Sequence, residues 1–158
     1  MQPSKIIVIG IGNPYRSDDA AGLIVARRLK ERSIHCCEVH ELVGEGTALM
    51  DLWEGAQRVV VIDAVQSGAA PGTIHRFHAN LHPLPAPIFH DSTHAFGLIE
   101  AIELSRALKQ LPSNLVIYGI EGQNFAAGTG LSQTVLDGVN DLVRDLRQEI
   151  DSSPAGNG

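Results

Sequence analysis

An α/β fold is predicted by this sequence: a three-layer α/β/α sandwich with a twisted, mostly parallel sheet of about five strands. The first observation is a pair of continuous β-branched runs, KIIVIG at Lys5–Gly10 and RVVVIDAV at Arg58–Val65. Such runs are typical of strands covered on both faces. A third strand-like run, NLVIYGIE, lies at Asn114–Glu121. Between these runs apolar residues recur at helical spacing, and strands that alternate with helices indicate a mostly parallel sheet.

The first half of the chain alternates strand and helix. After the first strand, apolar residues at helical spacing predict a helix over Asp18–Arg32. A strand over Ile34–Leu42 follows, and a short helix over Thr47–Glu54 leads into the strand at Arg58–Val65.

The second half begins with a Pro-Gly pair that opens a short strand at Thr73–His78. Three prolines within His82–Phe89 exclude a regular helix, so we expect a loop there. Helical periodicity over Thr93–Leu111 ends before Pro112. The last element is an amphipathic helix over Leu131–Ile150.

Length and composition favour one domain. The chain has 158 residues with 44% apolar content, enough to fill a single core. We expect this domain to span residues 1–150 and to be followed by a disordered tail, residues 151–158. Cys36 and Cys37 are expected to be small buried hydrophobic residues.

The charge and apolar patterning exclude several classes of partner. A net charge of -6 provides no basic face for nucleic acid. The apolar run Ile6–Ile11 is far too short to cross a membrane and lacks the features of a secretion signal. We therefore expect a cytoplasmic protein that acts as a monomer and does not insert into membranes.

The turn after the first strand has two interpretations. Gly10 and Gly12 favour a dinucleotide-binding turn, but position six of that fingerprint is Tyr15 instead of Gly. Asp18 and Asp19 then occupy the expected helix start, where their carboxylates would repel a nucleotide. We expect Asp18 to cap the helix and Asp19 to project toward the sheet edge, ready to bind a cation or act as a base.

Three further residues lie where a site is expected in such a sheet. Asp63 ends an apolar run and faces the crevice beside the first loop, although a turn-forming role alone is also possible. His94 begins a predicted helix, where the dipole favours a neutral imidazole able to bind metal. Together with Asp19 they form a set acceptable to nickel, zinc or iron. Glu121 ends a strand and is either a substrate contact or a solvated acid.

Four motifs occur in a fixed order: GIGNPYRSDDAAG, then VVVIDAV with SGAAPGTIH just beyond it, then DSTHAFGL, and finally YGIEGQNFAAGTGLS. This series, over about Lys5–Ile150, resembles the successive signatures of the hydrogenase maturation endopeptidases. The resemblance implies the family's twisted sheet between helices and its peptide-hydrolysing activity. It also implies that Asp19, Asp63 and His94 contact nickel and serve in catalysis. Many members carry an acid before Gly-Gly-Thr; here Glu45 is offset by one position and is our candidate for that substrate-binding acid.

The resemblance implies a specific reaction. The expected substrate is the large-subunit precursor of a nickel-iron hydrogenase, cleaved near its C-terminus after nickel insertion. Nickel on the substrate then serves as the recognition handle, and we expect no tightly bound resident cofactor. Because no Ser-His-Asp order, HExxH helix or nucleophilic cysteine is recognisable, a non-cleaving, nickel-dependent checkpoint protein is the alternative. A nucleotide-binding domain resting on Gly10 and Gly12 is a second alternative.

Overall fold

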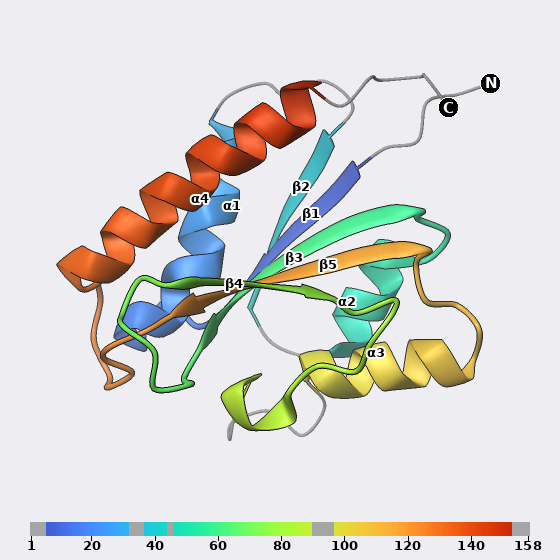
Figure 1. The fold of residues 1–158 in the computed structure, drawn as a ribbon, viewed down its shortest axis with the longest axis horizontal. Helices are drawn as coiled ribbons and strands as arrows, with labels where there is room; N and C mark the ends of the chain where they lie inside the picture. Colours follow the sequence, from blue (N-terminus) through green and yellow to red (C-terminus); the bar gives the residue numbers. More distant parts are fainter. Residues whose placement is uncertain (1–5, 32–36, 44–45, 90–96, 153–158) are drawn as a thin grey trace.

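A twisted five-stranded sheet forms the middle layer of the structure (Figure 1). This computed structural model describes residues 6–31, 37–43, 46–89 and 97–152. The strand order is β2-β1-β3-β5-β4, in which only β4 runs antiparallel to its neighbour. The strands are β1 Ile6–Ile11, β2 Cys37–Leu42, β3 Arg58–Val65, β4 Ile74–His78 and β5 Asn114–Glu121.

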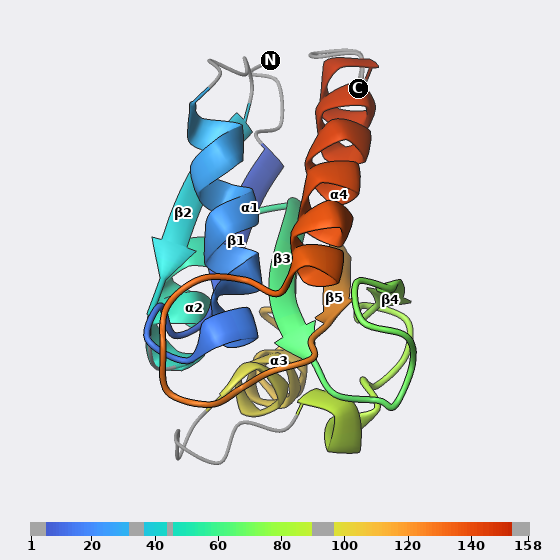
Figure 2. The same cartoon turned by 90° about the vertical axis from the view of Figure 1, so that its left-hand side faces the viewer.

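Helices cover both faces of this sheet, which confirms the three-layer prediction (Figures 1 and 2). One face carries the 3₁₀ turn η1 and two helices, namely η1 Ser17–Ala20, α1 Ala21–Lys30 and α4 Gln133–Ser152. The other carries two helices and a second 3₁₀ turn, namely α2 Gly46–Trp53, η2 Ala86–Phe89 and α3 Leu98–Ala107.

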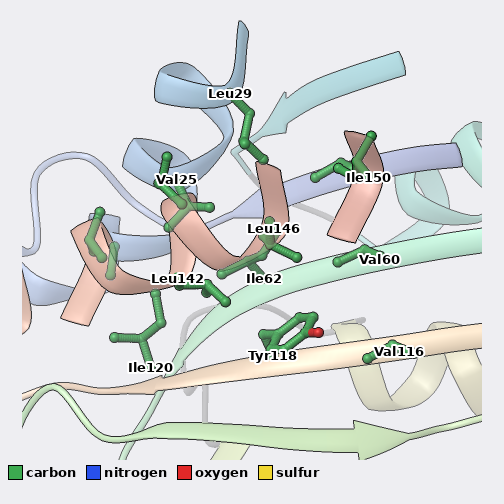
Figure 3. Close-up of a cluster of buried hydrophobic side chains, with 14 of the residues drawn as sticks. Val25, Leu29, Val60, Ile62, Val116, Tyr118, Ile120, Leu142, Leu146 and Ile150 are labelled. Carbon is green, nitrogen blue, oxygen red and sulfur yellow. The ribbon is translucent and has the colours of Figure 1, made fainter. Parts of the chain in front are cut away.

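The β-branched runs serve both layers because successive side chains of a strand point to opposite faces. In β3, Val60 and Ile62 pack toward α1 and α4, whereas Val59 and Val61 pack toward α2 and α3. Figure 3 shows the first of these clusters, in which strand residues meet α1 and α4; the helix residues are Val25, Leu29, Leu142, Leu146 and Ile150. Burial of both strand faces explains why the sequence runs are continuously apolar.

Several element boundaries differ from the sequence prediction. The first helix begins as η1 and becomes α-helical only at Ala21. The proline-rich stretch predicted as a loop contains η2, a short 3₁₀ turn compatible with its prolines. Helix α3 begins at Leu98, after an extended Gly97 whose N–H donates to Glu100 Oε2 at 3.1 Å.

Some predictions fall outside the described residues. These include the start of the second strand at Ile34, the side chain of Cys36 and the tail beyond Ser152, where α4 ends. Cys37 is half-buried, and burial raises the pKa of its thiol to about 11, which fits a packing role. Within the described segments, every helix is too short or too polar to cross a bilayer.

Candidate active site

The carboxyl ends of β1, β3 and β5 meet at one edge of the sheet, where sites of parallel sheets form. Gly10 pairs with Ile62 of β3, and Asp63 pairs with Gly119 of β5. The segments that follow these strands, residues 12–20, 66–73 and 122–132, therefore surround one edge. Asp19, Asp63 and Glu121 all belong to that edge.

Glycines bring the start of α1 directly onto the strand ends. A Cβ atom at Gly12 would lie 2.1 Å from the Asp19 carbonyl oxygen. A Cβ atom at Gly22 would lie 2.5 Å from the Ile11 carbonyl oxygen and 2.3 Å from that of Ile62. These close approaches require glycine, and they place η1 against β3.

The same packing accounts for the glycines without a nucleotide. A Cβ atom at Gly10 would lie 2.1 Å from the carbonyl oxygen of Gly22. The close approach of α1 to β1 thus explains why position 10 is glycine. Gly10 and Gly12 serve helix–strand packing, and this observation removes the basis of the nucleotide-binding alternative.

Asp19 and Asp63 are both half-buried at this edge. The N–H of Asn13 donates to Asp19 Oδ2 at 3.0 Å, which fixes the carboxylate within the first loop. Asp63 Oδ1 accepts a bond from the N–H of Ala64 at 2.8 Å, while β3 itself continues to Val65. The structure therefore brings two of the three predicted ligands to one edge of the sheet, Asp19 on η1 and Asp63 near the end of β3, and η1 packs against β3.

His94 and Glu45 lie outside the described residues, so their predicted roles stay predictions. Within the part of the chain that the structure describes, no group of three His, Cys, Asp or Glu side chains is arranged to hold a metal ion. Asp19 and Asp63 contribute two oxygen donors, and a third donor has to come from elsewhere to hold a transition metal.

Asp18 does not cap its own helix, contrary to the sequence prediction. Its carboxylate is fully buried and accepts bonds from the N–H groups of Gln123 at 2.9 Å, Asn124 at 2.8 Å and Ser132 at 2.7 Å. The Ser132 hydroxyl donates a fourth bond at 2.8 Å. Burial opposes ionisation, but these bonds outweigh it and hold the pKa of Asp18 below its ordinary value. Asp18 thus anchors the loop between β5 and α4.

The loop between β5 and α4 runs beside the loop between β1 and η1, and hydrogen bonds connect the two loops (Figure 2). Ser17 N–H donates to the Gly128 carbonyl at 3.0 Å, and Gly128 N–H donates to the Tyr15 carbonyl at 2.9 Å. The Ser17 hydroxyl donates to the Ala126 carbonyl at 2.9 Å. Ser17 adopts a positive φ of 51°, a rare conformation for a residue with a side chain, which these bonds maintain.

Glu121 is only 2% exposed, so the interpretation as a solvated strand-end acid is wrong. Its carboxylate accepts bonds from the N–H of Ser67 at 2.8 Å, from the Ser67 hydroxyl, and from His75 Nε2 at 3.1 Å. Burial again opposes ionisation, but the bonds from Ser67 and His75 hold the pKa of Glu121 below its ordinary value.

Comparison with known proteins decides the family. A sequence model of hydrogenase maturation proteases matches residues 24–149. The chain belongs to this family. The assignment confirms the prediction of a hydrogenase maturation protease that the four motifs provided.

Several characterised hydrogenase maturation proteins resemble this protease family member. HupD of Thiocapsa roseopersicina is 30% identical over 119 residues, which are 74% of this chain and 54% of that protein. HupD of Rhodobacter capsulatus is 26% identical and covers 92% of this chain and 73% of its own length. The hydrogenase 2 maturation protease of Escherichia coli is 28% identical, covering 83% of this chain and 81% of its own.

Solved structures support the family fold. The hydrogenase maturating endopeptidase HybD from Escherichia coli superposes with a TM-score of 0.81 at 22% identity, covering 95% of this chain and 94% of that one. HybD from Thermococcus kodakarensis, a [NiFe] hydrogenase maturation protease, gives 0.72 at 27% identity, covering 92% and 99%.

Sequence reasoning missed two polar residues of this maturation protease. Ser67 and His75 both lie in the SGAAPGTIH motif, which marked the family but gave no indication of a common partner. Their shared contact with Glu121 depends on the pairing of β4 and β3 with β5, which the sequence does not display.

Proposed function

We propose that this chain is an endopeptidase that removes the C-terminal extension of a nickel-iron hydrogenase large-subunit precursor after nickel insertion. The family assignment supports the reaction class. The observation that supports the site is the packing of η1, which carries Asp19, against β3, which carries Asp63, made possible by glycine at positions 12 and 22. Asp18 and Glu121, the other two acids among the described residues of this edge, are buried and bonded within the protein.

In this proposal the metal belongs to the substrate. Asp19, Asp63 and His94 coordinate nickel that is already bound to the precursor, and this contact places the cleavage segment at the sheet edge. The attacking water is activated either by a carboxylate of this pair or by the substrate's nickel. Glu45 is proposed to contact the substrate nearby. We further propose that the enzyme acts as a cytoplasmic monomer without a tightly held cofactor.

The test is cleavage of purified precursor, followed as loss of mass by the large subunit. Nickel-loaded precursor should be cut and nickel-free precursor should not, because the nickel contact positions the scissile bond. Asp63→Asn should abolish most cleavage without unfolding the chain, since the amide keeps the size and the oxygen that accepts the Ala64 N–H while losing the charge.

His94→Ala should behave like Asp63→Asn because it removes a proposed ligand. His82→Ala is the matched control, since His82 is an exposed residue between β4 and η2. Equal cleavage of both precursors, or full activity in Asp63→Asn, would contradict the nickel contact. Nickel-dependent binding of the precursor without any change of mass would identify the checkpoint protein instead.

A further inference from the structure

We infer that Glu121 is a positioning residue of the site, which fixes the β3–β4 loop that follows Asp63 and, through that loop, the η2 turn. The inference rests on the proposed function, because the groups that Glu121 positions are those of the proposed cleavage reaction. The sequence left two interpretations for this residue, a substrate contact or a solvated acid. The structure assigns it a different role because its carboxylate is already occupied within the protein.

Occupation of the carboxylate is the first step. Ser67 N–H binds Oε2, whereas the Ser67 hydroxyl and His75 Nε2 both bind Oε1. The Glu121 side chain is 3% exposed, while the His75 side chain is 23% exposed. A substrate group would have to displace these partners from a carboxylate that is itself buried and has little room for a further contact. Direct contact with substrate is therefore disfavoured.

The second step is the loop itself, residues 66–73, which is fastened to Glu121 and its neighbour at both ends. At the β3 end, Gly122 N–H donates to the Val65 carbonyl at 3.0 Å. At the β4 end, Gly72 N–H donates to the Glu121 carbonyl at 2.8 Å, and Glu121 N–H donates to the Thr73 carbonyl at 2.9 Å. The carboxylate binds Ser67, two residues after β3, so a side chain holds the loop near its β3 end as well.

The third step connects the loop to η2. Gln66, the residue before Ser67, donates its N–H to the Ile88 carbonyl of η2 at 3.0 Å. The rings of Phe77 on β4 and Phe89 at the end of η2 meet edge to face, with centroids 5.5 Å apart. Loss of the Glu121 bonds would thus loosen both the end of β3 beyond Asp63 and the η2 turn.

The fixing of the β3–β4 loop by Glu121 can be tested without a cleavage assay, by amide hydrogen exchange. The N–H groups of Gln66 and Ser67 should exchange slowly in the wild type because both are bonded. Glu121→Gln keeps one acceptor oxygen but turns the other into a donor, so it cannot accept all three bonds. Exchange at these two amides should therefore become faster. Unchanged exchange at both amides would show that Glu121 does not fix the loop, whatever the cleavage activity of the variant.

The catalytic consequence is tested on nickel-loaded precursor. Glu121→Gln should lower kcat at least about tenfold with KM kept within about twofold, because misplaced reacting groups slow the chemical step more than they weaken binding. Ser67→Ala should show a smaller effect in the same direction, and Ser67→Thr should restore activity because it retains the hydroxyl. Wild-type kcat in Glu121→Gln would overturn the inference.

Glu149→Gln is the control for loss of a glutamate charge. Glu149 accepts a bond from the Tyr118 hydroxyl at 3.2 Å and pairs with Arg58 at the opposite end of β3. Its substitution should leave kcat unchanged. If Glu121→Gln lowers only the melting temperature, with kcat per folded molecule unchanged, the role is structural and the inference fails. If wild-type protein cuts no precursor, the proposed function fails, and the positioning role falls with it.

Discussion

Asp18 and Asp19 are neighbours in the sequence, yet their carboxylates have different surroundings. Asp18 is fully buried and holds four hydrogen-bond donors of a distant loop, whereas Asp19 is half-buried and accepts the N–H of Asn13. Asp63 and Glu121 show a similar contrast at the ends of β3 and β5. In each pair, the buried acid binds backbone N–H groups of a loop at this edge of the sheet: Asp18 those of the β5–α4 loop, and Glu121 that of Ser67 in the β3–β4 loop.

Asp18→Asn should lower the free energy of unfolding at neutral pH by about 2–4 kcal/mol, because an amide cannot accept all four bonds and the backbone donors are buried. The folded-state pKa of Asp18 is lowered from 3.8, so its ionised form stabilises the fold above that pH. This contribution is lost as the pH falls below 3.8 through the folded-state pKa.

The measurement is chemical denaturation of wild type and Asp18→Asn as a function of pH. The difference between the two proteins should be largest at neutral pH and should shrink in acid. Asp19→Asn, a change at the adjacent position, should cost less stability while abolishing cleavage. A difference that stays constant down to strongly acidic pH would contradict the role of the Asp18 charge.

At the scale of elements, the site depends on how closely α1 approaches the sheet. A Cβ atom at Gly22 would lie 2.5 Å from the carbonyl oxygen of Ile11 in β1 and 2.3 Å from that of Ile62 in β3. Any side chain at this position must push α1 and the preceding η1 away from β3. Gly22 therefore allows η1, which carries Asp19, to pack against β3, which carries Asp63.

Gly22→Ala should lower the free energy of unfolding by about 1–3 kcal/mol, as overpacking does in other cores, and should reduce cleavage in the molecules that remain folded. Gly97→Ala is the matched control: its Cβ would meet only the flexible end of Glu100 at 3.4 Å. Circular dichroism melts and the cleavage assay provide the two measurements. Equal stability and activity in both variants would show that α1 is free to shift.

The elements that the sequence predicted best are the buried strands. The predicted bounds of β3 and β5 match the structure because a strand covered on both faces is apolar along its whole length. Helix starts were predicted less well. The geometry of η1 depends on bonds from Ser17 and Asp18 to residues 124–128, and the role of Asp18 follows from the same distant contacts. The residue pattern around Ser17 and Asp18 contains no information about hydrogen-bond partners that lie so far away in the sequence.

At the scale of the whole molecule, the proposed ligands make the protein a poor metal carrier by itself. Three ligands without a thiolate leave coordination positions open and give modest affinity. Purified protein should therefore retain no nickel or zinc after dialysis against a chelator, as measured by elemental analysis. Stoichiometric metal that survives this treatment would point instead to a hydrolase with a resident metal.

The long-range bonds of Asp18 also constrain when the enzyme becomes competent during its own synthesis. Asp18 and Asp19 leave the ribosome early, but the donors that fix this region come from Gln123, Asn124 and Ser132, and the bond to Ser132 spans 114 residues. Contacts of such sequence separation form late in folding. A nascent chain that ends before Ser132 contains the proposed catalytic residues Asp19 and Asp63 but lacks the complete loop to which Asp18 binds. The chain therefore has to extend through Ser132 before this edge of the sheet can take its final form.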